Sequence, residues 1–292
     1  MTYYEKNGGV FLTGCENFSV KKTLECGQVF RYGILSENKY QICAGEKMVY
    51  IEETDGKVYF YPCEKTEFQD FWLNYFDLPR DYGVINAALT KSGGVMERAV
   101  SFGGGIRILN QLPFETLISF IVSQRKNIPA IKKAVDNICA FAGRDMGGYY
   151  AFPTPEALAG LTYEDFCALK TGFRAKYLFD AAQKVYKGEV SLKKDMAQDA
   201  LRGELLKIYG VGEKIADCTL LFAFGARDVF PIDVWIKRAV ETFYFDGENL
   251  SINEIAAFAR EKYGNCAGCA QQYLYYYARS SRRDYIFGRT AQ

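Results

Sequence analysis

The stretch LLKIYGVGEKIADCTLLFAFGARDVFPID, residues 205–233, decides how this chain is organised. Apolar residues repeat at helical spacing on either side of a Gly-Val-Gly turn. Two glycines around one small apolar residue let main-chain N–H groups point outward from the turn. The next helix begins there, so its unpaired N–H groups and positive dipole end face the same way and suit a phosphate. We therefore predict a helical hairpin over about 205–224 that binds phosphate through Gly210, Val211 and Gly212.

Three polar residues follow this turn at spacings that suit chemistry. Lys214 stands in the first turn of the second helix, and Cys218 lies four residues later on the same face. A short loop then brings Asp233 to the start of another helix. From spacing alone, Lys214 could be a surface residue, Cys218 a small packing residue and Asp233 a simple N-cap.

The composition describes a folded globular protein and excludes several kinds of site. The 292 residues are 49% hydrophobic with a net charge of +1, so a nucleic acid would have to meet a local face and backbone amides. The chain has no histidine, which excludes Ser-His-Asp catalysis and every metal site that uses histidine. Its nine cysteines indicate reduced cytosolic thiols.

No targeting or membrane segment is expected. The first apolar run is short and broken by glycines, which is unlike a signal peptide. No run of about eighteen apolar residues predicts a transmembrane helix. We therefore expect a cytoplasmic protein that does not interact with membranes.

Hydrophobic patterning divides the chain into two parts. Strand-like segments at 28–35, 39–44, 47–52 and 57–62 predict an antiparallel meander. The run of three glycines at 103–105 is interpreted as a hinge, after which the pattern is helical. We predict an α+β fold in which a β-rich domain with helices, 1–102, precedes two all-helical subdomains that flank a cleft, 103–292. The predicted helices are at about 81–89, 93–102, 114–123, 127–141, 162–169, 173–187, 199–209, 213–224, 232–243, 251–263 and 267–280.

The Gly-Val-Gly turn, Lys214 and the sequence Pro-Ile-Asp-Val at 231–234 together resemble the helix-hairpin-helix DNA glycosylases with a Gly/Pro-rich loop and a terminal aspartate, the HhH-GPD superfamily. Ala-Asp-Cys at 216–218 narrows the resemblance to the 8-oxoguanine DNA glycosylase branch, of which the chain looks like a bacterial member. Further segments match that family in order: GQVFR at 27–31, GIR at 105–107, LISFI at 117–121, GFRAKY at 172–177 and AGCAQ at 267–271.

The resemblance implies a bifunctional enzyme that removes 8-oxoguanine from double-stranded DNA. In the family a lysine amine, here Lys214, attacks C1′ of the sugar, expels the base and forms a Schiff base that permits strand cleavage by β-elimination. Asp233 would stabilise positive charge on the sugar and assist proton transfers. A Lys⁺/Cys⁻ pair of Lys214 and Cys218 is a further hypothesis, since its dipole would suit a polarised lesion. The family's activity implies no cofactor, no catalytic metal and a protein that acts as a monomer.

The same resemblance assigns residues that would read the base. Gln271 would contact the Watson–Crick edge, while Cys218 and Tyr275 would sandwich the ring. The carbonyl of Gly27 would accept the hydrogen that 8-oxoguanine, unlike guanine, carries at N7. Phe173 would fill the vacated place in the DNA stack, and Arg174 with Arg125 would meet the opposite base.

Other features modify this assignment. Ala130 stands where eukaryotic members have an arginine, which predicts a weaker preference for cytosine opposite the lesion. Cys266 and Cys269 are not followed by further cysteines, so we expect packing and not the iron–sulfur cluster of related endonucleases. Hairpin carbonyls are candidates for a structural monovalent cation, as in the superfamily. A group of four arginines could touch phosphates or form a solvated face: Arg279, Arg282, Arg283 and Arg289.

Two alternative functions remain open at this point. One is a non-catalytic helix-hairpin-helix DNA-binding module, which would need the hairpin but not Lys214 together with Asp233. The other is a glycosylase for a different damaged purine, which would share these two residues but not Gly27, Cys218 and Gln271.

Overall fold

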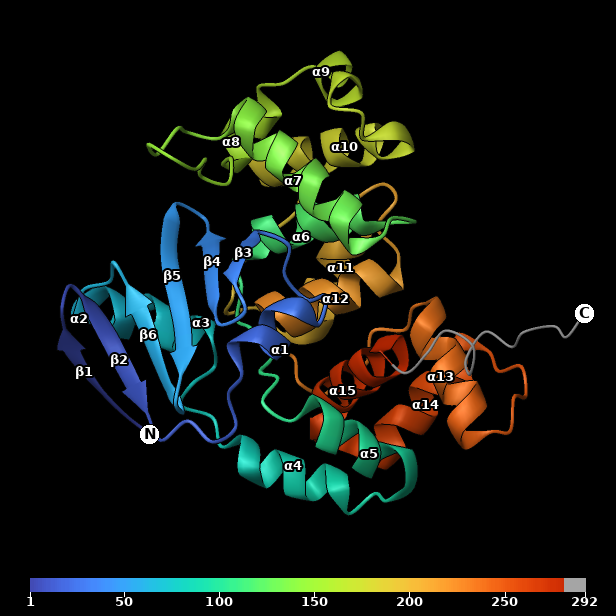
Figure 1. The fold of residues 1–292 in the computed structure, drawn as a ribbon. Coiled ribbons are helices and arrows are strands. Elements are labelled where there is room, and N and C mark those ends of the chain that lie inside the picture. Colours follow the sequence, from blue (N-terminus) through green and yellow to red (C-terminus); the bar gives the residue numbers. More distant parts are fainter. Residues whose placement is uncertain (281–292) are drawn as a thin grey trace, which may run out of the picture.

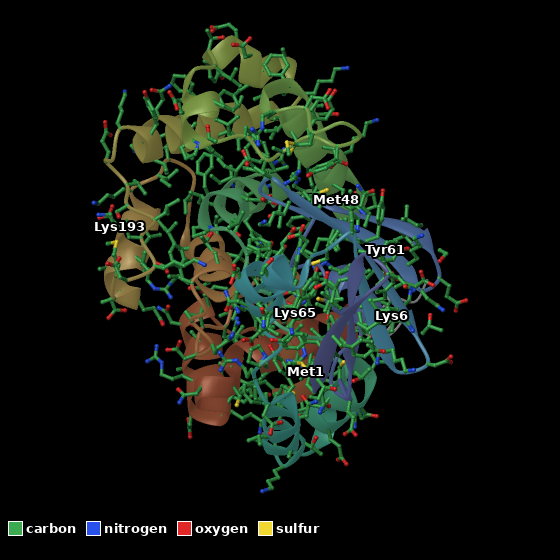
Figure 2. The ribbon with its side chains drawn as sticks, turned by 90° about the vertical axis from the view of Figure 1, so that its left-hand side faces the viewer. Met1, Lys6, Met48, Tyr61, Lys65 and Lys193 are labelled. Atoms are coloured by element: carbon green, nitrogen blue, oxygen red, sulfur yellow. The ribbon has the colours of Figure 1, made fainter. Side chains whose placement is uncertain are left out.

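The computed structural model describes residues 1–280, which form an antiparallel sheet beside a larger set of helices (Figure 1). The sheet has the order β1-β2-β6-β5-β4-β3, and alternate residues of its strands face the core. Figure 2 shows Lys6 and Tyr61 on this sheet, across the molecule from Lys193. The strands are β1 (Thr2–Lys6), β2 (Gly9–Thr13), β3 (Tyr32–Ser36), β4 (Lys39–Ala44), β5 (Lys47–Thr54) and β6 (Lys57–Tyr61).

The helices follow the predicted order, and most predicted bounds agree to within a few residues. No helix in residues 1–280 is long and apolar enough to cross a membrane. The α-helices are α1 (Val20–Glu25), α2 (Lys65–Glu67), α3 (Leu73–Tyr75), α4 (Tyr82–Thr90), α5 (Gly94–Gly103), α6 (Pro113–Ser123), α7 (Ile128–Ala142), α8 (Pro155–Ala159), α9 (Tyr163–Ala168), α10 (Ala175–Tyr186), α11 (Gln198–Leu206), α12 (Glu213–Ala223), α13 (Val234–Tyr244), α14 (Ile252–Tyr263) and α15 (Ala267–Ser280). Shorter turns are η1 (Phe68–Trp72), η2 (Gly172–Arg174) and η3 (Gly264–Cys266).

The α+β fold is confirmed, but three details of the β-rich part differ from the prediction. The strand expected at 28–35 begins only at Tyr32, because the side chain of Gln28 is buried and bonds to the main chain around it. Strand β1 was not predicted, since four of its five residues are exposed and give no alternation. Helix α1 was also missed, because six residues are too few to show a helical period.

Two apolar cores support this fold. The first lies between the sheet, α1 and the segment from α2 to α3, and the second joins the helices from α4 onward. Helices α4 and α5 contribute to the second core, and α5 packs against α15. The division of the chain between residues 102 and 103 stays a prediction.

The glycine run at 103–105 does not form the expected hinge. The Gly105 carbonyl accepts hydrogen bonds from the Ser19 N–H at 2.9 Å and the Thr23 hydroxyl at 3.2 Å. The Lys22 ammonium donates to the carbonyls of Phe102 and Gly104. These bonds fasten the end of α5 to α1, so the glycines serve close packing.

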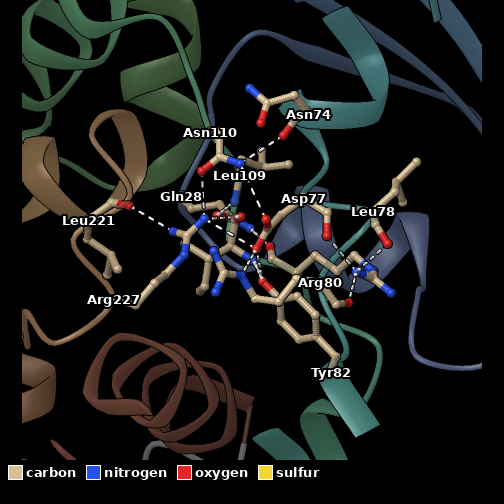
Figure 3. Close-up of polar contacts among 12 residues, drawn as sticks. Gln28, Asn74, Asp77, Leu78, Arg80, Tyr82, Leu109, Asn110, Leu221 and Arg227 are labelled. Atoms are coloured by element: carbon tan, nitrogen blue, oxygen red, sulfur yellow. Dashed lines mark hydrogen bonds and ion pairs between the residues drawn. The ribbon is translucent and has the colours of Figure 1, made fainter. Parts of the chain in front are cut away.

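A buried polar network fixes the loop after α12 to the rest of the molecule (Figure 3). The Arg227 guanidinium donates to the Leu221 carbonyl at 3.0 Å, to the Asp77 carboxylate at 3.3 Å and to the Asn110 amide oxygen at 2.6 Å. Arg107 donates to the main-chain carbonyl of Asp77 at 2.7 Å. Separating a buried ion pair leaves each charge buried without a partner, which is strongly destabilising. This network therefore holds the loop that leads to Asp233 in one position.

Candidate active site

A pocket of about 530 Å³ lies where α12, α15, the start of α7 and the turn after α1 meet. Apolar rings of Phe30, Phe120 and Phe222 line part of its wall, and the last two stack at 5.5 Å. All six residues predicted for catalysis and base recognition line this pocket: Gly27, Lys214, Cys218, Asp233, Gln271 and Tyr275.

Lys214 and Asp233 reach the pocket from the starts of two helices. Lys214 lies in the first turn of α12, with its Nζ 5.0 Å from the centre of the Phe120 ring. Asp233 is the N-cap of α13, and its Oδ1 accepts from the Ile236 N–H at 2.8 Å. Burial raises the pKa of Asp233, while the Ile236 N–H and the charge of Lys214 oppose that shift. Asp233 is therefore a helix cap whose carboxylate also faces the pocket.

Cys218 is buried at the pocket wall, one turn after Lys214 on α12. Burial raises the pKa of its thiol to about 11, although the nearby Lys214 acts in the opposite direction. The neutral thiol is therefore the form at neutral pH, and the hypothesis of a thiolate paired with the lysine is not supported.

This result gives a testable titration. The Cys218 thiol should react slowly with iodoacetamide at neutral pH and faster as the pH approaches 11. In Lys214→Gln the curve should move to still higher pH, because the lysine charge lowers the pKa of the thiol in the wild type. Mapping the modified peptide by mass spectrometry separates Cys218 from the other cysteines. Half-maximal reaction near neutrality would restore the thiolate hypothesis.

The turn that carries Gly27 requires a glycine. Its φ is +89°, and an added Cβ would lie 3.2 Å from the Tyr275 ring and 3.3 Å from Ile128. The preceding Cys26 carbonyl accepts a hydrogen bond from the buried Gln272 amide at 2.7 Å. The turn is thus held against α15. Because Gly27 has no side chain, its main chain itself lines the pocket.

Gln271 and Tyr275 project from α15 four residues apart, on one face of the helix. Gln271 is 6% exposed, and its Oε1 is a buried acceptor without a hydrogen-bond partner in the described chain. An unpaired buried acceptor destabilises the protein, and a hydrogen bond from a ligand would remove this cost. Tyr275 is also largely buried, which raises the pKa of its hydroxyl despite the nearby Arg279.

The predicted hairpin is formed by α11, the Gly-Val-Gly turn and α12. Gly210 has a φ of +80°, and an added Cβ would lie 2.4 Å from the Tyr177 ring, so only glycine fits. Val211 is buried beneath the turn, whereas Gly212 is exposed and is the N-cap of α12. No side chain among residues 1–280 caps this helix, which leaves its first N–H groups open to a ligand.

The three residues predicted to meet the DNA stack lie outside the pocket lining but close to one another. Phe173 is 44% exposed at the 3-10 turn η2, and the Arg174 guanidinium lies 4.3 Å from its ring centre. Arg174 is itself buried and donates to the carbonyls of Thr171 and Gln124. Arg125, on the exposed loop after α6, has a φ of +52°. Phe173 and Arg125 are therefore exposed to solvent, whereas Arg174 is buried.

Other pocket residues were not predicted from the sequence. Gln272 and Glu25 line the pocket, and Tyr32 and Asn127 do so as well. The Gln272 bond to the Cys26 carbonyl joins residues 246 apart in the chain, and no local pattern announces such a contact. Asn127 could have been recognised, because an asparagine before Ile-Pro is a good N-cap, and its side chain caps α7.

The remaining sequence hypotheses have mixed outcomes. Cys269 is buried in the helical core and Cys266 is half-buried, both as free thiols, in agreement with packing. Arg279 lines the pocket. The other three arginines of its group lie outside the described residues: Arg282, Arg283 and Arg289.

Comparisons with known proteins agree with this geometry. Residues 10–117 match the 8-oxoguanine DNA glycosylase N-terminal domain, and residues 118–264 match the HhH-GPD superfamily base excision DNA repair protein family. A solved structure of MBOgg1 with a low-affinity DNA ligand is 42% identical and has a TM-score of 0.92, covering 96% of this chain and 99% of that one. The Clostridium acetobutylicum 8-oxoguanine glycosylase/lyase, solved with DNA containing cytosine opposite 8-oxoguanine, is 41% identical with a TM-score of 0.92, covering 96% and 98%.

A curated relative is more distant. The probable N-glycosylase/DNA lyase of Methanothermobacter thermautotrophicus is 30% identical over 203 residues, which cover 61% of this chain and 64% of that protein. The match therefore spans less than two thirds of that relative's length. Both halves of the described fold are nevertheless accounted for by family matches and by full-length structural likeness. The chain belongs to the HhH-GPD superfamily of base excision DNA repair proteins, in the 8-oxoguanine DNA glycosylase family.

Proposed function

We propose that the chain is a bifunctional DNA glycosylase and abasic-site lyase that removes 8-oxoguanine from double-stranded DNA. The pocket carries this proposal, because it joins Lys214, Asp233 and the unpaired acceptor of Gln271. A non-catalytic hairpin module would need no such pocket. A glycosylase for another purine would not need Gly27 and Cys218 at the same wall. The similarity to 8-oxoguanine glycosylase/lyases supports the same substrate.

The proposed reaction begins with attack by the neutral amine of Lys214 on C1′ of the damaged nucleotide. The bond between C1′ and N9 breaks, and the base leaves with the electron pair and takes up a proton. The Asp233 carboxylate stabilises positive charge on the sugar and accepts a proton from the attacking nitrogen. The bond between C1′ and O4′ then breaks, O4′ takes up the proton held by Asp233, and a protonated Schiff base remains at C1′. Loss of a C2′ proton expels the 3′ phosphate and cleaves the strand.

Recognition requires that the base leave the DNA stack and enter the pocket. Gln271 would then accept from the Watson–Crick edge, and the ring would lie between Cys218 and Tyr275. A carbonyl at Gly27 would accept the N7 hydrogen of 8-oxoguanine, whereas guanine would present a lone pair. An unpaired or repelled acceptor costs about 1–3 kcal/mol, which favours the oxidised base. The apolar rings of the pocket wall would help to keep water from this contact.

The DNA backbone would be held by the hairpin and the neighbouring loops. The hairpin turn of Gly210, Val211 and Gly212 would hold a phosphate through the open N–H groups at the start of α12, since the Val211 N–H itself donates to the Ile208 carbonyl at 3.0 Å. Phe173 would occupy the gap that the flipped base leaves, because it is exposed at a turn beside the pocket. Arg174 and Arg125 would approach the opposite base from the same side.

Sodium borohydride trapping tests the proposed function. The protein is mixed with duplexes that contain a single 8-oxoguanine opposite cytosine, an alkylated purine, or no damage. A covalent adduct confined to the 8-oxoguanine duplex is expected, because borohydride reduces the Schiff base to a stable amine. Release of the base without an adduct would indicate a monofunctional enzyme. An adduct or release only with the alkylated purine would favour the alternative glycosylase, and neither product would favour the binding module.

Discrimination of the opposite base should be weaker than in relatives with an arginine at the position of Ala130. Ala130 has no side-chain donor, and one lost hydrogen bond corresponds to roughly a 3- to 10-fold change. We expect the excision rate opposite cytosine to exceed that opposite adenine by a correspondingly smaller factor, and Ala130→Arg to raise this ratio. Single-turnover rates on the two duplexes measure it. A ratio as steep as that of relatives with arginine at this position would contradict this prediction.

We further propose that hairpin carbonyls hold a monovalent cation with a structural role. Within residues 1–280 the Gly210 carbonyl accepts a single long hydrogen bond, 3.4 Å from the Gln124 amide, which leaves it able to bind an ion. Main-chain carbonyl oxygens can replace the hydration shell of a monovalent ion such as K⁺. The nine free thiols support a reducing compartment, and we propose that the protein acts in the bacterial cytoplasm at the nucleoid.

A further inference from the structure

One charged side chain of the pocket has no role in the reaction described above. Arg279 lies in the last turn of α15 and lines the pocket with Lys214 and Gln271. Its Nη2 donates to the main-chain carbonyl of Glu25 at 2.8 Å. This bond holds the guanidinium against the end of α1, at the pocket wall. Arg279 is therefore placed differently from an arginine on a solvated face.

The second terminal nitrogen of Arg279 is a buried donor without a partner. Nη1 makes no hydrogen bond within the described part of the chain. It lies 3.4 Å from the position that a Cβ on Gly27 would occupy, and the guanidinium carbon is 5.7 Å from the Tyr275 ring centre. Arginine stays protonated in proteins, and a buried donor left unpaired costs free energy. Nη1 can therefore donate to an acceptor on a ligand.

Gln271 supplies the complementary feature on the same helix. Its Oε1 is a buried acceptor without a partner among the described residues. Residues 271, 275 and 279 are spaced by four, so they follow one face of α15, and the first and last are about 12 Å apart along the axis. An acceptor, an aromatic ring and a donor thus succeed one another along the pocket. This order fits a purine that stacks on the ring, with donors on one edge and an acceptor on the other.

We propose that Arg279 recognises the flipped base through a carbonyl oxygen next to N7. Nη1 would donate to O6 or O8 while the Gly27 carbonyl accepts the N7 hydrogen between them. The inference rests on the proposed function, since it requires the oxidised purine in this pocket. Guanine lacks O8, and adenine lacks both oxygens. Arg279 therefore adds a second check on the edge of the base that Gly27 reads.

Arg279→Leu tests this assignment, because it removes the donors and keeps an apolar stem. Single-turnover rates are measured on an 8-oxoguanine duplex and on a duplex with a preformed abasic site. We expect the ratio of excision to abasic-site cleavage to fall roughly 10- to 100-fold, since only excision involves the base. An equal fall in both rates would assign Arg279 to holding α15 against α1 and would overturn the proposal. A wild-type protein that excises nothing would reject the proposed function, and this inference with it.

Further variants separate direct recognition from an effect through Tyr275. Arg279→Lys keeps the charge but has one nitrogen to serve both the Glu25 carbonyl and the oxygen of the base. It should therefore give an intermediate ratio of excision to abasic-site cleavage. In a Tyr275→Phe background, Arg279→Leu should still lower the ratio by the same factor. If it has no effect there, Arg279 acts only through the tyrosine hydroxyl and the proposal fails. Arg260→Leu is the matched control, because Arg260 is exposed on α14 and does not line the pocket.

Binding to a second oxidised base identifies the oxygen. 8-Oxoadenine keeps O8 and the N7 hydrogen but has an amino group in place of O6. Dissociation constants are measured for a duplex with 8-oxoguanine and for a duplex with 8-oxoadenine. The proteins are Lys214→Gln and the Lys214→Gln, Arg279→Leu double variant. Weaker binding of both bases by the double variant assigns O8, and weaker binding of 8-oxoguanine alone assigns O6. Unchanged binding of both would overturn the proposal.

Discussion

Replacing Lys214 with glutamine is expected to abolish excision of 8-oxoguanine and borohydride trapping while DNA binding persists. Glutamine is similar in length, but its amide nitrogen cannot attack C1′ or form a Schiff base. Losing a catalytic nucleophile costs about 10³-fold or more in rate. Binding should remain because the hairpin amides and the rest of the pocket are unchanged. Single-turnover excision, trapping and a gel-shift titration measure the three quantities.

Lys214→Gln should remain folded, so a loss of activity in this variant reports on catalysis. The Lys214 side chain contacts the pocket wall at Phe120 and takes no part in the buried ion pairs that hold the fold. Lys65→Gln, on the exposed helix α2 of the sheet domain, is a matched control and should leave all three quantities unchanged. Near-normal cleavage by Lys214→Gln would show that another amine attacks the sugar.

Local sequence signals predicted those parts of the site that depend on local geometry. The Gly-Val-Gly turn and Lys214 in the next helical turn are adjacent in the sequence. Local geometry alone therefore places the amine beside the open N–H groups at the start of α12. The family resemblance added Gly27, Gln271 and Tyr275, and the structure brings all of them to one pocket. Fold class was similarly accessible, because strand and helix periods differ clearly in the two parts of the chain.

What the sequence could not supply depends on contacts between distant segments. Gln28 sits in a segment with a strand-like pattern, but its buried amide bonds to the Arg107 carbonyl and interrupts the strand. The glycines at 103–105 looked flexible, yet Gly103 leaves room for the Tyr273 ring of α15 and Gly105 for Ser19 at the start of α1. Arg279 was grouped with C-terminal arginines because its partner, the Glu25 carbonyl, is 254 residues away. Such pairings depend on tertiary packing and produce no periodic pattern in the sequence.

Asp233→Asn is expected to lower excision by about 10²-fold or more without unfolding the protein, since positioned acid–base groups contribute at least this much. Asparagine caps helices as well as aspartate does, so the bond to the Ile236 N–H is retained. Burial raises the pKa of Asp233, which means that folding disfavours the ionised carboxylate. Its contribution to stability is therefore greatest at low pH and declines as the pH rises through the raised pKa. A neutral asparagine should consequently be tolerated at neutral pH.

The pH dependence of excision separates catalysis by Asp233 from capping. In the wild type the ionised carboxylate is the active form, so the rate should fall as the pH falls through the raised pKa of Asp233. The asparagine variant should lack this acidic limb. Asp233→Ala removes the cap as well and should cost about 1 kcal/mol of stability, measured by urea unfolding. If the alanine and asparagine variants lose excision only in proportion to their stability, Asp233 is a cap alone. If asparagine keeps its stability and loses the rate, the carboxylate acts on the sugar.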